Sequence, residues 1–236
     1  MIEVYITNLG KYNEGILCGE YLKLPAEMED VKSLLSRIGV DGVMYEETFI
    51  TDYETDIEGL CKYLGEYESV DELNYLASII EDMDDWEIEK FEAAIAYGER
   101  TESTKDLINL AQNLDCYDLY REVSDEEDLG RYYIDELCML EIPEHIEPYF
   151  DYEAYGRDID QGGNGVFLKG GGYITNDGGF IEHYSGRDDL PDEYKIFAYP
   201  DPPGKMPIAK QIEMYKNMVS PTPIVEKTIK THDDRM

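Results

Sequence analysis

The chain has 236 residues, and its 54 Asp and Glu residues against 20 Lys and Arg give a formal net charge of −34 at pH 7. A surface this acidic repels nucleic acid and anionic lipid, so we expect neither as a ligand and expect a basic protein surface as the partner. Hydrophobic residues make up 42% of the chain, which excludes a mainly disordered protein.

Residues 1–56 predict a small α+β domain. Residues 3–24, EVYITNLGKYNEGILCGEYLKL, alternate like a β-hairpin, and the turn chemistry lies in Asn8–Gly15. We expect a helix from about Ala26 to Ile38 and then a strand around Val43–Asp52.

Residues 57–114 predict a mostly helical domain. Ser69–Glu72 and Asp84–Glu87 have the spacing of capping boxes, and the second predicts a helix over Asp85–Tyr97. Capping and the helix dipole explain three of the seven acids in residues 81–92, EDMDDWEIEKFE. Each like-charge pair among the others costs roughly 0.2–0.5 kcal/mol on a helix. The acidic cluster therefore calls for a reason beyond local structure.

Residues 115–185 predict a second α+β domain. A helix is expected from the capping-box spacing Ser124–Glu127 to about Leu140. Glycine-punctuated strands follow in residues 166–184, with a hairpin turn at Asn176–Gly179.

Residues 186–236 have a different character and predict a proline-rich extension with a short amphipathic helix after Pro207. Residues 1–184 contain 45 acidic and 12 basic residues, a net charge of −33, whereas residues 185–236 contain nine and eight, a net charge of −1. Acidity for adaptation to salt would not stop at residue 185. Forty-five carboxylates on a ball with a radius of gyration of roughly 16 Å would repel one another strongly. The sequence thus predicts an α+β fold in which three small domains (α/β, mostly helical, α/β) form an elongated string followed by the extension.

Catalytic and metal-binding motifs are not found. Cys138 and His145 lack a residue that would activate or orient them, and GGNGVFLKGGG lacks the GK[ST] of a phosphate loop. Asp158–Gly165 begins like a calcium loop, but its twelfth position is Lys169 instead of Glu. We expect no catalytic residue, no metal and no cofactor.

The four cysteines are scattered without CxxC spacing, and MIEVYIT at the N-terminus has no basic signal region. Apolar runs are too short to span a membrane. We therefore expect a cytoplasmic protein with free thiols.

The charge density points to imitation of DNA. A duplex carries one negative charge per roughly 1.7 Å, so 45 carboxylates correspond to about 75 Å of duplex. Acids three and four residues apart on a helix recur every 5–6 Å or so, near the spacing of phosphates on one strand. Two alternatives stay open. The first is an acidic module or DNA mimic that binds another DNA-binding protein, such as a repressor, a nucleoid protein or a CRISPR effector. The second is a carboxylate-dependent enzyme.

Three segments carry a family resemblance. YITNLGKYNEG (5–15), RYYIDELCMLEIP (131–143) and EPYFDYEAYGRDID (147–160) resemble segments of the ArdA-type antirestriction proteins of conjugative plasmids and transposons, over about residues 2–184. The resemblance implies an elongated, curved homodimer joined largely through its third domain. It further implies that the protein occupies the DNA groove of type I restriction–modification enzymes, formed by their specificity and modification subunits, without catalysis or cofactor.

The candidate partner-binding residues are acidic. The resemblance assigns phosphate mimicry to four acids of the last motif: Asp151, Glu153, Asp158 and Asp160. Charge density alone adds eight more: Glu46, Glu47, Asp52, Glu54, Glu81, Asp82, Asp85 and Glu89. Three motif tyrosines are expected to serve as dimer contacts or core residues: Tyr149, Tyr152 and Tyr155. Arg157 is expected to organise the neighbouring acids by ion pairing.

Overall fold

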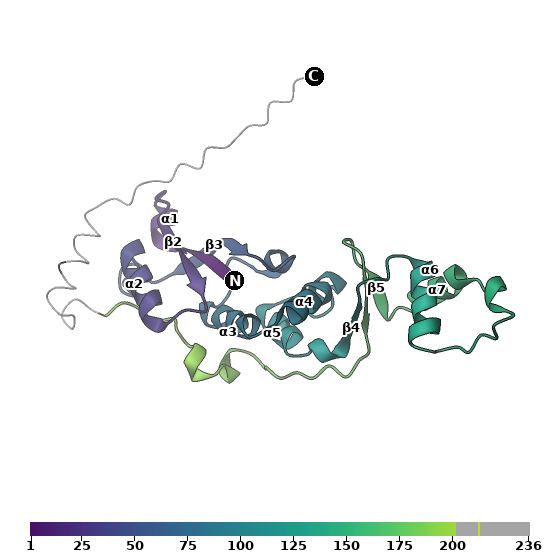
Figure 1. Ribbon diagram of the computed structural model, residues 1–236. Helices are drawn as coiled ribbons and strands as arrows, with labels where there is room; N and C mark the ends of the chain where they lie inside the picture. Colours follow the sequence, from purple (N-terminus) through teal and green to yellow (C-terminus); the bar gives the residue numbers. More distant parts are fainter. Residues whose placement is uncertain (202–211, 213–236) are drawn as a thin grey trace, which may run out of the picture.

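The computed structural model describes residues 1–201 and Ile212. The body is elongated, with a three-stranded sheet at the N-terminal end, helices in the middle, a second three-stranded sheet, and a pair of helices at the far end (Figure 1). The predicted α+β class is confirmed, whereas the amphipathic helix predicted after Pro207 lies outside the described residues. None of the helices in residues 1–201 is long and apolar enough to cross a membrane.

The first sheet contains β1 (Ile2–Asn8), β2 (Gly19–Leu24) and β3 (Thr48–Thr55), in the order β2-β1-β3. Both pairings are antiparallel, so the predicted hairpin of β1 and β2 is confirmed. The third strand begins five residues later than predicted, because Val43 and Met44 lie exposed in a loop before it.

Two helices belong to this sheet. Helix α1 (Leu9–Asn13) occupies the hairpin connection, and the side chain of Asn8 caps it by accepting a hydrogen bond from the Lys11 amide. Helix α2 (Met28–Ile38) begins after a capping box of Glu27 and Asp30. Its apolar face is buried: Val31, Leu34, Leu35 and Ile38.

The middle of the body consists of α3 (Val70–Glu81), α4 (Asp85–Tyr97) and α5 (Thr104–Ala111), preceded by a helical turn at Leu60–Tyr63. The helix predicted over Asp85–Tyr97 is therefore confirmed. These helices bury the residues of period 3.6 that the sequence shows on α3: Val70, Leu73, Leu76, Ala77 and Ile80.

The two capping boxes predicted for the middle helices differ. At α4 both halves are present, because the Glu87 amide donates to Asp84 (2.8 Å) and the Asp84 amide donates to Glu87 (2.9 Å). At α3 the side chain of Ser69 accepts from the Glu72 amide, but the Glu72 carboxylate turns into the protein and binds Tyr184 and Arg187. The predicted hydrogen bond from the Ser69 amide to the Glu72 carboxylate is therefore wrong, because that carboxylate binds residues far away in the sequence.

The second sheet contains β4 (Tyr117–Tyr120), β5 (Gly165–Phe167) and β6 (Tyr173–Asn176), in the order β4-β6-β5. The hairpin turn lies at residues 168–172, where Leu168 and Gly172 are joined by a backbone hydrogen bond of 2.9 Å. The predicted hairpin at Asn176–Gly179 is wrong: the chain turns there, with the Gly178 amide donating to the Asn176 side chain at 2.9 Å, but it then leaves the sheet and forms no further strand up to residue 201.

Helices α6 (Glu126–Arg131) and α7 (Tyr152–Gln161) form the far end. Asp125, and not Ser124, caps α6, which continues as a π-helical turn over Tyr132–Glu136 and stops before the predicted end at Leu140. Helix α7 was not among the predicted elements.

Two glycines explain how closely α6 and α7 pack. A methyl group at Gly156 would lie 1.8 Å from the carbonyl oxygen of Glu126, and one at Gly130 would lie 2.0 Å from the carbonyl oxygen of Tyr152. The two helix backbones therefore touch, and only glycine fits at these positions.

A continuous hydrophobic core runs from the first sheet through the middle helices to β4, and a smaller core lies under α6: Val123, Leu129 and Tyr173. The predicted boundaries at residues 56, 114 and 185 remain predictions.

The chain after β6 does not form the further strand expected up to Tyr184. Residues 180–201, here named the strap, run back beneath the middle helices towards the first sheet (Figure 1). Two single helical turns interrupt the strap, at Arg187–Asp189 and at Asp192–Tyr194.

Candidate partner-binding surface

The loop between α2 and β3 presents Glu46 and Glu47, and both are exposed. Asp41 holds this loop, because one of its carboxylate oxygens accepts hydrogen bonds from the amides of residues 43, 44 and 45 at 2.8–3.1 Å. Burial alone would raise the pKa of Asp41, but these three donors outweigh it and lower the pKa. The local sequence thus fixes where the two glutamates stand.

Strand β3 carries Asp52 and Glu54 on one exposed face, since side chains two residues apart in a strand point the same way. The hydroxyl of Tyr21 on β2 donates to Asp52 (2.6 Å) and to Glu54 (3.2 Å). These hydrogen bonds raise the pKa of Tyr21, with burial as the next cause, and they offset part of the repulsion between the two carboxylates.

The acidic cluster of residues 81–92 is divided between two helices. Glu81 ends α3, Asp82 follows it, and Asp85 opens α4; all three are exposed. Glu89 is half-buried and forms an ion pair with Arg121, whose guanidinium carbon lies 4.3 Å from the ring centre of Trp86. Arg121 directly follows β4, so the sequence of α4 alone could not predict this ion pair.

The last motif forms α7. Asp151 caps the helix by accepting from the Ala154 amide at 3.0 Å, and Glu153 forms an ion pair with Arg157 one turn later. Asp158 is exposed, and Asp160 lies beside Tyr173, whose pKa is raised first by burial and then by that carboxylate. Among the predicted phosphate mimics, Glu89 and Glu153 thus face a cation of the chain itself.

The three motif tyrosines have different surroundings. Tyr152 is buried, and Arg131 lies over its ring at 4.3 Å, whereas Tyr149 is 85% exposed. Tyr155 is half-buried against the ring of Phe150, with centroids 5.8 Å apart. The structure therefore leaves only Tyr149 fully available to a partner.

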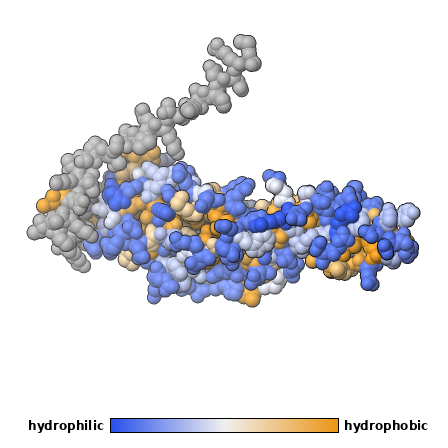
Figure 2. All heavy atoms as spheres, viewed as in Figure 1, coloured by the Kyte–Doolittle hydropathy of each residue, from blue (hydrophilic) through white to orange (hydrophobic). Residues whose placement is uncertain are grey.

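The chain between α6 and α7 exposes, beside the predicted contact residue Tyr149, four apolar side chains that the sequence did not single out: Leu137, Met139, Leu140 and Ile146. Figure 2 shows apolar surface at this end of the molecule, whereas most of the visible body is hydrophilic. Their position between two helices, rather than any periodicity, leaves them uncovered. We name these five residues the tip patch.

A cleft of about 530 Å³ opens where α4 meets β4 and α6, lined by Trp86, Tyr120, Arg121, Arg131, Tyr132 and Asp135 among others. The two arginines are already engaged, Arg121 with Glu89 and Arg131 with Glu127. Among residues 1–201, no three His, Cys, Asp or Glu side chains are placed to hold a metal ion.

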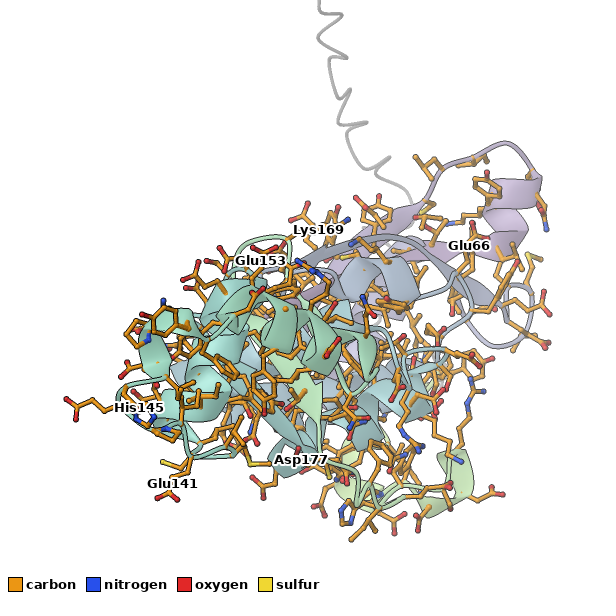
Figure 3. All side chains as sticks on the ribbon, turned by 90° about the vertical axis from the view of Figure 1, so that its right-hand side faces the viewer. Glu66, Glu141, His145, Glu153, Lys169 and Asp177 are labelled. Atoms are coloured by element: carbon orange, nitrogen blue, oxygen red, sulfur yellow. The ribbon has the colours of Figure 1, made fainter. Side chains whose placement is uncertain are left out.

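Carboxylates project from several flanks of the body, as Glu66, Glu141, Glu153 and Asp177 illustrate (Figure 3). A duplex likewise carries charge around its circumference, because both strands have phosphates. An elongated shape with acids on more than one flank is suited to a groove that encloses DNA.

A family model described as antirestriction protein (ArdA) matches residues 4–175. The chain belongs to this family. ArdA proteins are non-enzymatic antirestriction proteins that imitate DNA, so the predictions of antirestriction function and of no catalytic activity are confirmed. No curated protein matches the chain. The ArdA match ends at β6, and the strap lies beyond it.

Proposed function

We propose that this ArdA protein protects incoming mobile DNA by occupying the DNA-binding groove of a type I restriction–modification enzyme, where its carboxylates take the place of phosphates. The observation that carries the proposal is the distribution of exposed acids over the whole length of an elongated body, from Glu46 beside the first sheet to Asp158 on α7. A groove lined by Lys and Arg would release its counterions to this surface as it does to DNA.

The predicted acids should contribute unequally. Glu81, Asp82 and Asp158 are exposed and form no ion pair within the described residues, so they can meet the cations of a partner. Glu89 and Glu153 already face Arg121 and Arg157, and a partner would have to compete with these arginines.

Competition against DNA tests the proposal. A fluorescent duplex bound to a purified type I enzyme should be displaced by the protein, and the affinity of the protein for the enzyme should fall steeply between roughly 50 and 300 mM salt. A flat response to salt, or failure to displace the duplex, would overturn it. Recovery of other DNA-binding proteins in place of restriction subunits from a host lysate would favour the acidic-module alternative.

Charge variants sharpen the test. Exposed charges contribute about 0.2–1 kcal/mol each, so the triple variant Glu81→Gln, Asp82→Asn, Asp158→Asn should lose several-fold in affinity and should show a shallower salt slope. The variant Glu89→Gln, Glu153→Gln, whose two carboxylates are already paired, should lose less per substitution. Abolition of inhibition by one amide substitution would instead point to a carboxylate-dependent enzyme.

We further propose that two copies join through the tip patch. It gathers five large apolar side chains at the end of the body, and exposed apolar clusters of this kind mark contact sites. Light scattering should show a dimer that the pair Leu140→Ser, Tyr149→Ser converts to monomer. Val43→Ser is the control, since Val43 is equally apolar and 83% exposed at the opposite end. A dimer that survives the paired substitution would contradict this assignment.

A further inference from the structure

The strap lies outside the part of the chain that the antirestriction family accounts for. It nevertheless returns along the body and contributes buried apolar residues to the main core: Tyr184, Leu190 and Ile196. An extended segment without a strand partner needs other groups to satisfy its backbone. Helices α5 and α3 supply them.

Two asparagines, Asn109 on α5 and Asn113 two residues after its end, bind the strap backbone as a strand edge would. The side-chain oxygen of Asn109 accepts from the amides of His183 (2.7 Å) and Tyr184 (2.9 Å), and its nitrogen donates to the Tyr184 carbonyl (2.8 Å). One turn later, Asn113 accepts from the Ile181 amide (2.9 Å) and donates to the Ile181 carbonyl (2.8 Å). Both asparagines are buried, at 2% and 4% exposure, so their side-chain amides need these hydrogen-bond partners in place of water.

Two acids in the first turn of α3 bind the next part of the strap. The buried Glu72 carboxylate accepts from the Tyr184 hydroxyl (3.0 Å) and from the Arg187 guanidinium (2.8 Å). Asp71 accepts hydrogen bonds from two consecutive backbone amides farther along the strap, those of Ile196 (2.8 Å) and Phe197 (2.7 Å). These acids serve structure and are not phosphate mimics.

Aromatic packing fills the space between the polar anchors. Tyr75 on α3 contacts Tyr184 and Tyr194, with ring centroids 5.7 and 4.6 Å away. Tyr184 is only 2% exposed, as expected for the side chain that anchors an extended segment in a groove.

The strap then reaches the first sheet. The hydroxyl of Tyr199 donates to the Glu46 carbonyl at 2.9 Å, and its ring lies against Gly42, where a methyl group would be 2.8 Å away. The strap thus contacts the middle helices at one end and the loop that presents Glu46 and Glu47 at the other.

We propose that α3 and α5 form a peptide-binding groove whose ligand is residues 180–199 of the same chain, and that the bound strap clamps the first sheet to the middle helices at one angle. The occupant is the chain itself, because the strap starts only four residues after β6 ends and is matched to the groove by backbone and side chain alike. A functional role of the clamp in setting the spacing of the acids rests on the proposed function. The binding of the strap to the groove of α3 and α5 does not.

Cutting the chain tests the groove. The loop at Gly178 and Gly179 is exposed and has open space around it, so a specific protease site inserted there leaves the anchors intact. After cleavage of the full chain, the C-terminal fragment should coelute with the body on gel filtration at micromolar concentration. In the variant Asn109→Ala, Asn113→Ala, it should separate.

Ser78→Ala is the matched control, since Ser78 lies on α3 and its hydroxyl donates to the Tyr75 carbonyl of the same helix at 3.0 Å. Far-UV circular dichroism of the uncut variants establishes that they fold. Separation of the fragment from the otherwise unchanged body would overturn the proposal, as would its equal retention by the asparagine variant. Elution of the cut protein as a larger complex that exchanges fragments between copies would show that the groove works between chains, contrary to the proposal.

Tyr199→Ala tests the clamp separately, because it removes the contact with the loop that presents Glu46 and Glu47, while the anchors on α3 and α5 and the ion pair of Asp201 with Lys32 stay. Hydrogen exchange should become faster in residues 41–47 and should stay slow at residues 181–184. Unchanged exchange in residues 41–47 would refute the clamp and leave the groove standing. Neither experiment uses a restriction enzyme, so failure here is distinct from failure of the antirestriction mechanism.

Discussion

The substitution Gly156→Ala separates local helix propensity from tertiary packing, because the two predict opposite signs. Alanine in the middle of α7 should stabilise the helix by about 1 kcal/mol relative to glycine. The added methyl group, however, would lie 1.8 Å from the carbonyl oxygen of Glu126 and 2.8 Å from the amide nitrogen of Gly130. These are backbone atoms, so the whole of α6 must move. Overpacking of this kind costs about 1–3 kcal/mol and occasionally more; because the clash is with backbone, we take about 3 kcal/mol, which less the helix gain of about 1 kcal/mol leaves a net loss of about 2 kcal/mol.

Urea denaturation followed by circular dichroism measures this loss, which should lower the melting temperature by about 4–8 °C. Gly170→Ala is the control: its surroundings are open, and we expect a change within about 0.5 kcal/mol. Gly130→Ala should also destabilise, but the double variant should cost less than the sum, since helices already forced apart have room for the second methyl group. A Gly156→Ala protein as stable as the parent would refute the contact.

Three further predictions concern charge. Asp84→Ala removes the cap of α4 and should lower the free energy of unfolding by about 1 kcal/mol in the same urea assay; no loss would contradict the reciprocal capping box. Burial, and then a hydrogen bond with Asp177, raise the pKa of Asp118. The folded state therefore holds that proton more tightly, and stability falls as pH rises from about 3.8 through the raised pKa, so Asp118→Asn should gain stability relative to the parent at pH 7 but not at pH 3. Arg121→Gln releases Glu89 from its ion pair and should tighten binding to the restriction enzyme a few-fold in the competition assay, whereas weaker binding would show that the arginine itself meets the partner.

Elements with a complete local signal could be predicted. The capping box and helix of α4 need only Asp84, Glu87 and the apolar residues that follow, and the hairpin of β1 and β2 needs only alternation and a connecting turn. Helix α7 was missed because Gly156 lowers helix propensity in the middle of the motif. Glycine is required at position 156 because the backbone of α6 lies against it, and helix propensity takes no account of such a tertiary contact.

The candidate surface divides in the same way. Exposure of acids such as Glu81, Asp82 and Asp158 follows from their hydration, since carboxylates stay in water unless they are paired. The pairing of Glu89 with Arg121, and the burial of Glu72 beneath the strap, depend on residues that are distant along the chain. The tip patch carries no periodic signal at all.

By itself, the sequence determined the charge of the protein, its α+β class, its membership of an antirestriction family and the absence of catalytic motifs, because each of these is a property of single residues or short segments. Only the tertiary structure decided which acids are neutralised, which glycines allow two helices to touch, and where the chain goes after Asn176. The reason is physical. Net charge is a sum over single residues, so the sequence alone gives it. The role of a buried polar group such as Asn109 depends on partners more than seventy residues away, and only tertiary packing brings these within hydrogen-bonding distance.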